Sequence, residues 1–104
     1  YTETVKTLLE HGADVNAKDG YPLRAASKEG KTEVVKVLLE NGADIHASND
    51  ESLTLAAKHG QTETVKTLLE NGADIHAQFD WPLKVAARYN KQDIVNLLVI
   101  DYNM

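Results

Sequence analysis

Residues 62–70 read TETVKTLLE, and residues 2–10 read the same nine letters. The two copies start sixty residues apart, which is twice a shorter period, because residues 31–47 (KTEVVKVLLENGADIHA) align with residues 61–77 (QTETVKTLLENGADIHA). Between residues 21–50 and 51–80, 19 of 30 positions are identical, so chance does not explain the similarity. Repetition with a period of about 20–50 residues predicts a solenoid, in which each unit packs on its neighbours.

The first half of each unit predicts a short helix that starts near residue 21, 51 or 81. Pro22 and Pro82 suit the first turn of such a helix, where a backbone N–H has no partner to lose. The small residues that follow allow a neighbouring helix to approach closely. Gly30 and Gly60 mark the expected end of this helix in the two complete units.

The second half of each unit predicts another helix. We expect Thr32 and Thr62 to cap its N-terminus, with a glutamate in the first turn on the positive side of the helix dipole. Gly42 is suited to the left-handed position just after its end, as are Gly12 and Gly72. One face carries an apolar stripe that must be buried: Val34, Val35, Leu38 and Leu39.

These units predict one all-α domain over residues 1–104. It consists of a partial repeat at 1–20, full repeats at 21–50 and 51–80, and a truncated repeat at 81–104. A pair of helices this short cannot cover its apolar face alone, so each pair is expected to stack on the next. The chain opens without an initiator methionine, which favours a piece of a longer protein.

The pattern PLxxAAxxGxxxxVxxLLxxGADIxA resembles the ankyrin repeat, and the resemblance covers the whole chain. It implies a solenoid of helix-turn-helix units with β-hairpin or loop fingers between GADIHA and the next PL. The family period is about 33 residues, so the fingers should be short here. The threonine of the family's T-P-L-H box is replaced by Tyr21, Glu51 and Trp81. The 30-residue units reading GADIHA are also similar to those of ankyrin proteins from large DNA viruses.

Composition excludes several classes of function. The chain has 16 acidic and 11 basic residues and a net charge near −5, which argues against general affinity for nucleic acid. No apolar run approaches the roughly 20 residues needed to cross a bilayer. The chain has no cysteine, which excludes thiolate zinc sites and permits a reducing compartment, so an intracellular, cytoplasmic location is expected.

No set of residues predicts catalysis, a cofactor or a metal site. His46 and His76 are equivalent residues on neighbouring units, which stack about 8–10 Å apart, whereas zinc ligands lie about 2.0–2.1 Å from the ion. We therefore expect solvent-facing or backbone-bonding histidines. The regular row formed by Asp14, Asp44 and Asp74 is expected to hold loop structure. The chain is predicted not to be an enzyme.

The resemblance implies that a partner protein binds the concave face, which first helices and fingers line. The predicted first helices carry mostly basic side chains there, and aromatic residues gather near the last repeat boundary, which favours a partner with an acidic surface. The alternatives are that the lysines are only solvated and that the aromatics pack a terminal loop. The predicted partner-binding residues are Arg24, Lys28, Lys58, His59, Phe79, Trp81, Lys84, Arg88 and Tyr89.

Two alternatives to partner binding by an isolated module stay open. The array could act as a structural spacer, or as the substrate-recognition arm of a larger enzyme. The apolar stretch at residues 94–100 indicates either further repeats or self-association through the C-terminal face.

Asn16 resembles the asparagine-hydroxylation sites of ankyrin repeats. An engineered consensus-like origin is compatible with such regular units, although the irregular residues 89–104 argue against it.

Overall fold

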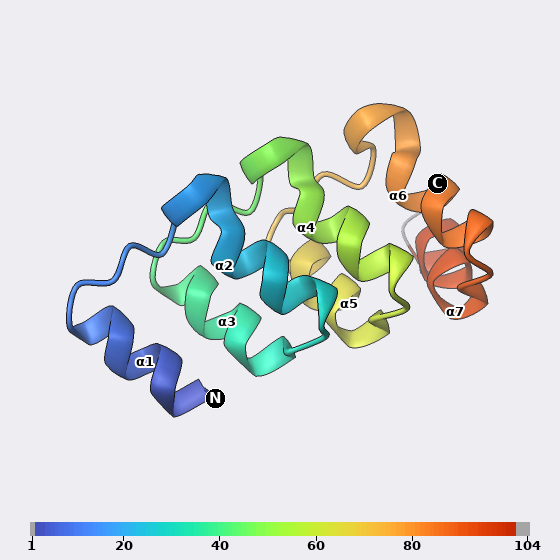
Figure 1. Ribbon diagram of the computed structural model, residues 1–104. Helices are drawn as coiled ribbons and strands as arrows, with labels where there is room; N and C mark the ends of the chain where they lie inside the picture. The colour runs from blue at the N-terminus through green and yellow to red at the C-terminus, as the bar shows by residue number, and fades with distance from the viewer. Residues whose placement is uncertain (1, 102–104) are drawn as a thin grey trace.

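The computed structural model describes residues 2–101, and these residues form two layers of helices (Figure 1). One layer contains α2 (Ala17–Lys28), α4 (Ala47–Lys58) and α6 (Ala77–Arg88). The other contains α1 (Thr2–Glu10), α3 (Thr32–Glu40), α5 (Thr62–Glu70) and α7 (Gln92–Asn96), which continues as the π-helix η1 (Leu97–Asp101). Helices of the same layer lie side by side, and the stack measures 41 × 22 × 20 Å.

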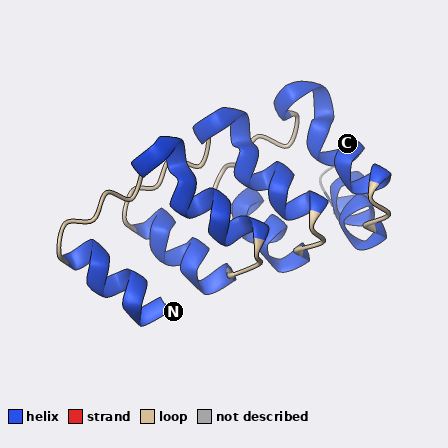
Figure 2. Ribbon diagram, viewed as in Figure 1, coloured by secondary structure: helices blue, strands red, loops and turns tan. Residues whose placement is uncertain are grey.

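The expected fingers take the loop form. Within residues 2–101 there is no β-strand, as Figure 2 shows. Instead, three successive residues at the start of each first-layer helix are left-handed, at positions 18–20, 48–50 and 78–80. The right-handed part of each helix therefore begins near residue 21, 51 or 81. Pro22 and Pro82 consequently lie in its first turn, where the missing N–H costs no helical hydrogen bond.

The helix ends agree with the sequence-based expectation. The first-layer helices α2 and α4 end at Lys28 and Lys58, and Gly30 and Gly60 follow with φ of 70° and 73°. Gly42 follows α3 with φ of 91°, and the N–H of Ala43 bonds the carbonyl of Leu38. These left-handed glycines let the chain reverse direction at no steric cost.

The prediction that Thr32 and Thr62 cap the second-layer helices is wrong. The capping position falls one residue earlier, because the carbonyl of Lys31 already accepts the first helical bond, from the N–H of Val35 at 2.9 Å. Neither Lys31 nor Gln61 makes a side-chain cap. The hydroxyl of Thr32 instead lies 2.9 Å from the hydroxyl of Thr64, so it links α3 to α5.

The hydrophobic core runs along the stack between the two layers. Leu23 and Leu53 from the first layer meet Val35, Val65 and Leu68 from the second, and each of these is at most 1% exposed. Ala56 and Ala86 are fully buried because small side chains let first-layer helices pack closely on their neighbours. Each repeat thus shares its core with the next, and this shared core holds the stack together.

The apolar C-terminal stretch forms the last second-layer helix. Ile94, Leu97 and Leu98 are buried, whereas Val99 and Ile100 of η1 are 42% and 69% exposed. The last three positions of the truncated repeat expected at 81–104 lie outside the described residues. Among residues 2–101, no helix is both long and apolar enough to span a membrane.

Candidate partner-binding surface

The right-handed parts of α2, α4 and α6 lie next to one another and present one edge to solvent (Figure 1). Between α2 and α4 this edge is hollowed into a depression of about 470 Å³. Tyr21, Arg24 and Lys28 line one side of the depression, and Glu51 and Leu55 of α4 line the other. The depression thus has an aromatic ring, two cations and two carboxylates, those of Glu29 and Glu51, around one cavity.

Arg24 is held at the finger end of this depression. Its Nε donates to the carbonyl of Asp19 at 3.3 Å, and its Nη2 donates to the carbonyl of Lys18 at 3.0 Å. The guanidinium carbon lies 5.8 Å from the centroid of the Tyr21 ring, in cation–π geometry. These contacts fix the guanidinium near the finger and reduce the entropy that a partner contact would cost.

A second group of basic residues lies at the opposite ends of the first-layer helices. The ammonium of Lys58 is 5.2 Å from the centroid of the Tyr89 ring. Burial lowers the pKa of His59 below its ordinary value, and the charges of Lys28, Lys58 and Lys91 lower that pKa further. Cations from three consecutive repeats therefore lie near His59 and disfavour its protonated form.

The first-layer surface differs from the second-layer face in the ion pairing of its basic side chains. Lys6, Lys36 and Lys66 each pair with the glutamate three positions earlier, at 3.4 to 3.7 Å. Within residues 2–101, no ion pair forms at any of the basic side chains predicted for the partner-binding surface: Arg24, Lys28, Lys58, Lys84 and Arg88. Among the described residues, the basic side chains of the first-layer edge are therefore not neutralised by direct ion pairs, and the carboxylates of Glu29 and Glu51 line the depression beside Arg24 and Lys28.

Phe79 is the least protected aromatic side chain described. It is 89% exposed, and its backbone is left-handed with φ of 59°. The equivalent residues Asp19 and Asn49 have φ of 56° and 58° and belong to the types that tolerate this region. At such a position a bulky apolar side chain is unfavourable, because the backbone is strained and the ring is exposed to water. This combination is typical of a residue that contacts a partner.

The predicted site residues fall into two groups along the surface. Arg24, Phe79 and Trp81 lie at the finger end, and the others lie toward the far ends of the helices. Residues 81 and 89 are eight positions apart, or about 12 Å along a helix. Lys84 lies between the groups, and the turn-end group consists of Lys28, Lys58, His59, Arg88 and Tyr89.

The sequence-based set omits five residues of the depression, which are Tyr21, Ala25, Glu29, Glu51 and Leu55. Tyr21 and Glu51 occupy the same repeat position as Trp81, so the alignment of the repeats contained the signal that would have found them. Leu55 is different, because Ala25 and Val85 occupy its position. Only the packing of α4 beside α2 shows that it lines a cavity.

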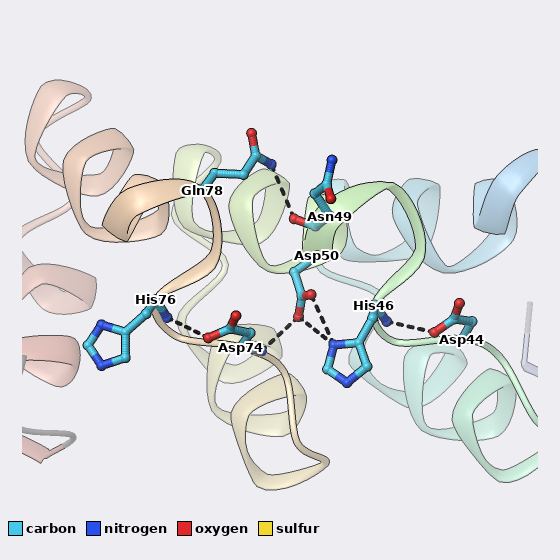
Figure 3. Close-up of polar contacts among 7 residues, drawn as sticks. All are labelled: Asp44, His46, Asn49, Asp50, Asp74, His76 and Gln78. Carbon is cyan, nitrogen blue, oxygen red and sulfur yellow. Dashed lines mark hydrogen bonds and ion pairs between the residues drawn. The ribbon is translucent and has the colours of Figure 1, made fainter.

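Figure 3 shows a polar network that joins the fingers of neighbouring repeats. The carboxylate of Asp50 accepts a bond from the N–H of Asp74 at 2.7 Å and lies 2.9 Å from Nδ1 of His46. Asp74 in turn accepts from the N–H of His76 at 2.9 Å, and Gln78 donates to the carbonyl of Asn49 at 3.1 Å. The aspartates therefore hold loop structure, as expected.

The histidines of this network are hydrogen-bonded to carboxylates. The side chain of His46 is 57% exposed, but its ring bonds Asp50 and not a backbone group. That hydrogen bond raises the pKa of His46; desolvation opposes the rise, and the charges of Asp50, Asp44 and Asp74 add to it. In the part of the chain that the structure describes, no three His, Asp or Glu side chains are grouped to hold a metal ion.

Asn16 occupies the repeat position of His46 and makes a different contact. Its Oδ1 accepts a bond from the N–H of Asp44 at 2.7 Å, and its Nδ2 donates to the carbonyl of Gly42 at 3.1 Å. Both ends of the amide therefore join the first finger to the next loop. The side chain that resembles a hydroxylation site is thus engaged between repeats.

Comparison with protein families identifies the class. A family model of ankyrin repeats in three copies matches residues 1–79 and 49–104, which together cover the chain. The chain belongs to the ankyrin repeat family, whose members are generally non-catalytic modules for protein–protein interaction. The family model describes ankyrin repeats in general, so the similarity to viral ankyrin proteins stays a prediction. No curated protein sequence matches the chain.

Proposed function

We propose that this chain binds an acidic surface of a partner protein through the edge formed by α2, α4 and α6 and their fingers. The observation that carries the proposal is the contrast in ion pairing. Every second-layer lysine of the repeated TETVK-type segments has a glutamate partner, whereas the cations of the first-layer edge have none among the described residues. Such a surface attracts acidic partners and accelerates their association.

Aromatic residues add an anchor to this electrostatic surface. Trp81 and Tyr89 are 37% and 46% exposed, and Phe79 projects from the last finger. Trp, Tyr and Arg are the residue types that most often dominate interface energetics. We infer that Phe79 and Trp81 anchor the partner while the turn-end cations orient it. The setting proposed for this interaction is the cytoplasm, within a longer array of repeats.

A pair of charge-reversal variants tests the proposal. One variant carries Lys28→Glu, Lys58→Glu and Arg88→Glu on the first-layer edge. The matched control carries Lys6→Glu, Lys36→Glu and Lys66→Glu on the second-layer face, so both variants have the same net charge. Circular dichroism first verifies that both are folded. Proteins captured from cell lysate are then identified by mass spectrometry, and binding is repeated at rising salt.

The expected result is that the first-layer variant loses partners that the control retains, and that rising salt weakens the retained binding. A third variant, Phe79→Asn, introduces the residue found at the equivalent position 49. Because Asn tolerates the left-handed backbone, this variant should stay folded while losing about 2 kcal/mol of binding free energy, as hot-spot residues do. Equal capture by all variants would contradict partner binding here and favour the spacer alternative.

The exposed end of η1 bears on assembly. Val99 and Ile100 are apolar and exposed, which supports continuation of the array. Self-association through this face is the competing interpretation. Sedimentation velocity at several concentrations separates the two, because only self-association makes the sedimentation coefficient rise with concentration.

A further inference from the structure

The turns between first-layer and second-layer helices interlock along the stack. The side chain of Gln61 lies over Gly30 of the preceding turn, and its Nε2 donates to the carbonyl of Lys28 at 3.1 Å. One repeat later Lys91 lies over Gly60, where a Cβ on the glycine would come within 3.2 Å of the lysine side chain. Glycine at this position therefore leaves room for the side chain of the next repeat, and Lys91 is held against the turn of the preceding repeat.

The lysines that end the first-layer helices reach in the opposite direction, toward the following repeat. The ammonium of Lys58 lies 5.2 Å from the centroid of the Tyr89 ring. His59 has the repeat position of Tyr89, and Lys28 has that of Lys58. The charge of Lys28 accordingly acts on His59 and lowers its pKa. The charge of each of these lysines therefore reaches the turn of the next repeat.

Three ammonium groups lie around the turn at residues 59–61, here called the basic turn. Lys28 belongs to the preceding repeat, Lys58 to the same repeat and Lys91 to the following one. Lys58 and Lys91 are half-buried, whereas Lys28 and His59 are exposed. Like charges repel more strongly where protein replaces water, so the basic turn favours a negatively charged ligand that reaches it from solvent.

Carboxylates of the chain do not neutralise the basic turn. Among the described residues, none of its three lysines forms an ion pair, and the pKa of His59 is lowered by lysine charges and raised by no carboxylate. Glu63, in the first turn of α5, pairs instead with Lys66 at 3.6 Å. Asp93 of α7 lines a hollow of about 290 Å³ together with Lys91 but forms no ion pair with it. The basic turn therefore carries an excess of positive charge.

A phosphate group matches this arrangement better than a carboxylate does. A carboxylate brings a single negative charge, whereas a phosphorylated side chain brings about −1.5 to −2 charges at pH 7 and three strong acceptor oxygens. Lysine binds phosphate as a point charge, so ammonium groups from different repeats can approach it from different sides. His59 adds a further donor when it is protonated, and a dianion beside the ring favours the protonated form.

We propose that the basic turn binds a phosphorylated side chain of the partner protein, with Lys28, Lys58 and Lys91 around the phosphate. This ligand deepens the proposed function and rests on it, because the basic turn belongs to the turn-end group of the same edge. It also assigns a role to a residue outside the predicted partner-binding set, since Lys91 lies in the turn between α6 and α7.

Peptide binding tests the nature of the ligand. The probe is a short capped glycine peptide with one phosphoserine, and two matched peptides carry glutamate or serine in its place. Each peptide is titrated into the isotope-labelled chain at constant ionic strength and followed by nuclear magnetic resonance. The phosphoserine peptide should bind at least about fivefold more tightly than the glutamate peptide. In its presence the pKa of His59 should rise, while that of His46 should stay unchanged.

A pair of variants locates the binding. One carries Lys28→Gln and Lys91→Gln, and the matched control carries Lys36→Gln and Lys66→Gln on the second-layer face, so both have the same net charge. Amide spectra verify that both are folded. The first variant should bind the phosphoserine peptide at least about tenfold more weakly than the control does. An unchanged pKa of His59, equal affinity for the phosphoserine and glutamate peptides, or equal binding by the two variants would each overturn the inference.

Phosphatase treatment distinguishes phosphate recognition from the proposed function. Proteins are captured by the original chain from cell lysate with and without prior phosphatase treatment, and the partners should be lost after treatment. Partners that persist after treatment, yet are lost by the first-layer charge-reversal variant, would overturn phosphate recognition and leave binding to an acidic surface intact. Equal capture by the original chain and the charge-reversal variant in both lysates would contradict both proposals.

Discussion

Helices α1 and α5 are identical in sequence but differ in the burial of their side chains. In α5, Thr64, Val65, Thr67 and Leu68 are buried, whereas α1 has no buried residue. The apolar stripe specifies which face of the helix must be covered, but the neighbouring helices decide whether it is. The same residue therefore contributes different amounts to stability at equivalent positions of this repeat array.

The largest difference is expected for the leucine pair. Leu68→Ala should lower the free energy of unfolding by about 2–5 kcal/mol, because it removes a fully buried side chain and leaves a cavity. Leu8→Ala should change it by no more than about 0.5 kcal/mol, because the side chain is mostly exposed. Urea unfolding followed by circular dichroism measures both. Similar losses in the two variants would show that α1 is covered in solution.

An intermediate difference is expected for two aspartates of the fingers, Asp50 and Asp80. Asp50 is 5% exposed and accepts the N–H of Asp74 from the next repeat, whereas the side chain of Asp80 is 48% exposed. Asp50→Ala should cost about 1–3 kcal/mol, because a backbone donor between repeats loses its partner. Asp80→Ala should cost at most about 1 kcal/mol, as for exposed ion pairs. Chemical denaturation of the two variants checks the order, and a larger loss for Asp80→Ala would contradict the network in Figure 3.

The smallest effect is a pH dependence from His46. Its pKa is raised in the folded state by the bond to Asp50. The folded state therefore binds the proton more tightly, and the stabilisation is present below the unfolded pKa of 6.5 and is lost as pH rises through the higher folded value. His59 has the opposite sign, because its lowered pKa removes stability as pH falls below 6.5.

The contribution of His46 to the pH dependence is separated from that of His59 by making the measurements in a His59→Gln variant. Thermal melts between about pH 5.5 and pH 8 should then show a small fall in melting temperature with rising pH. His46→Asn, which introduces the residue of position 16, should flatten that slope. An unchanged slope in the His46→Asn variant would show that the ring does not bond Asp50 in solution.

Sequence periodicity was sufficient for the architecture. The repeat of 30 residues, the prolines at helix starts and the glycines after helix ends gave the order and approximate bounds of the helices, because these depend on local backbone preferences. The capping threonines were wrong because each helix begins one residue earlier than the pattern suggests, with Lys31 and Gln61 at the capping positions. The hydroxyl of Thr32 bonds Thr64, a residue of the next repeat, and a local pattern contains no information about that contact.

The candidate surface was only partly accessible to sequence reasoning. Basic and aromatic residues at the first-helix positions could be predicted, because repeat alignment places them on one edge. Their division into a finger-end group and a turn-end group follows from the length of α6, and the inclusion of Leu55 follows from the depression between α2 and α4. Sequence position alone does not indicate which side chains of adjacent helices enclose a cavity.

The sequence by itself determined the unit: two short helices, the faces that must be buried, the ankyrin family and the acidic net charge. Those properties arise from residue type and spacing within about thirty positions. Only the tertiary structure decided that Leu8 is exposed while Leu68 is buried, and that the lysines of one layer are paired while those of the other are not. Burial and ion pairing depend on which repeat lies alongside, and identical segments cannot encode different neighbours.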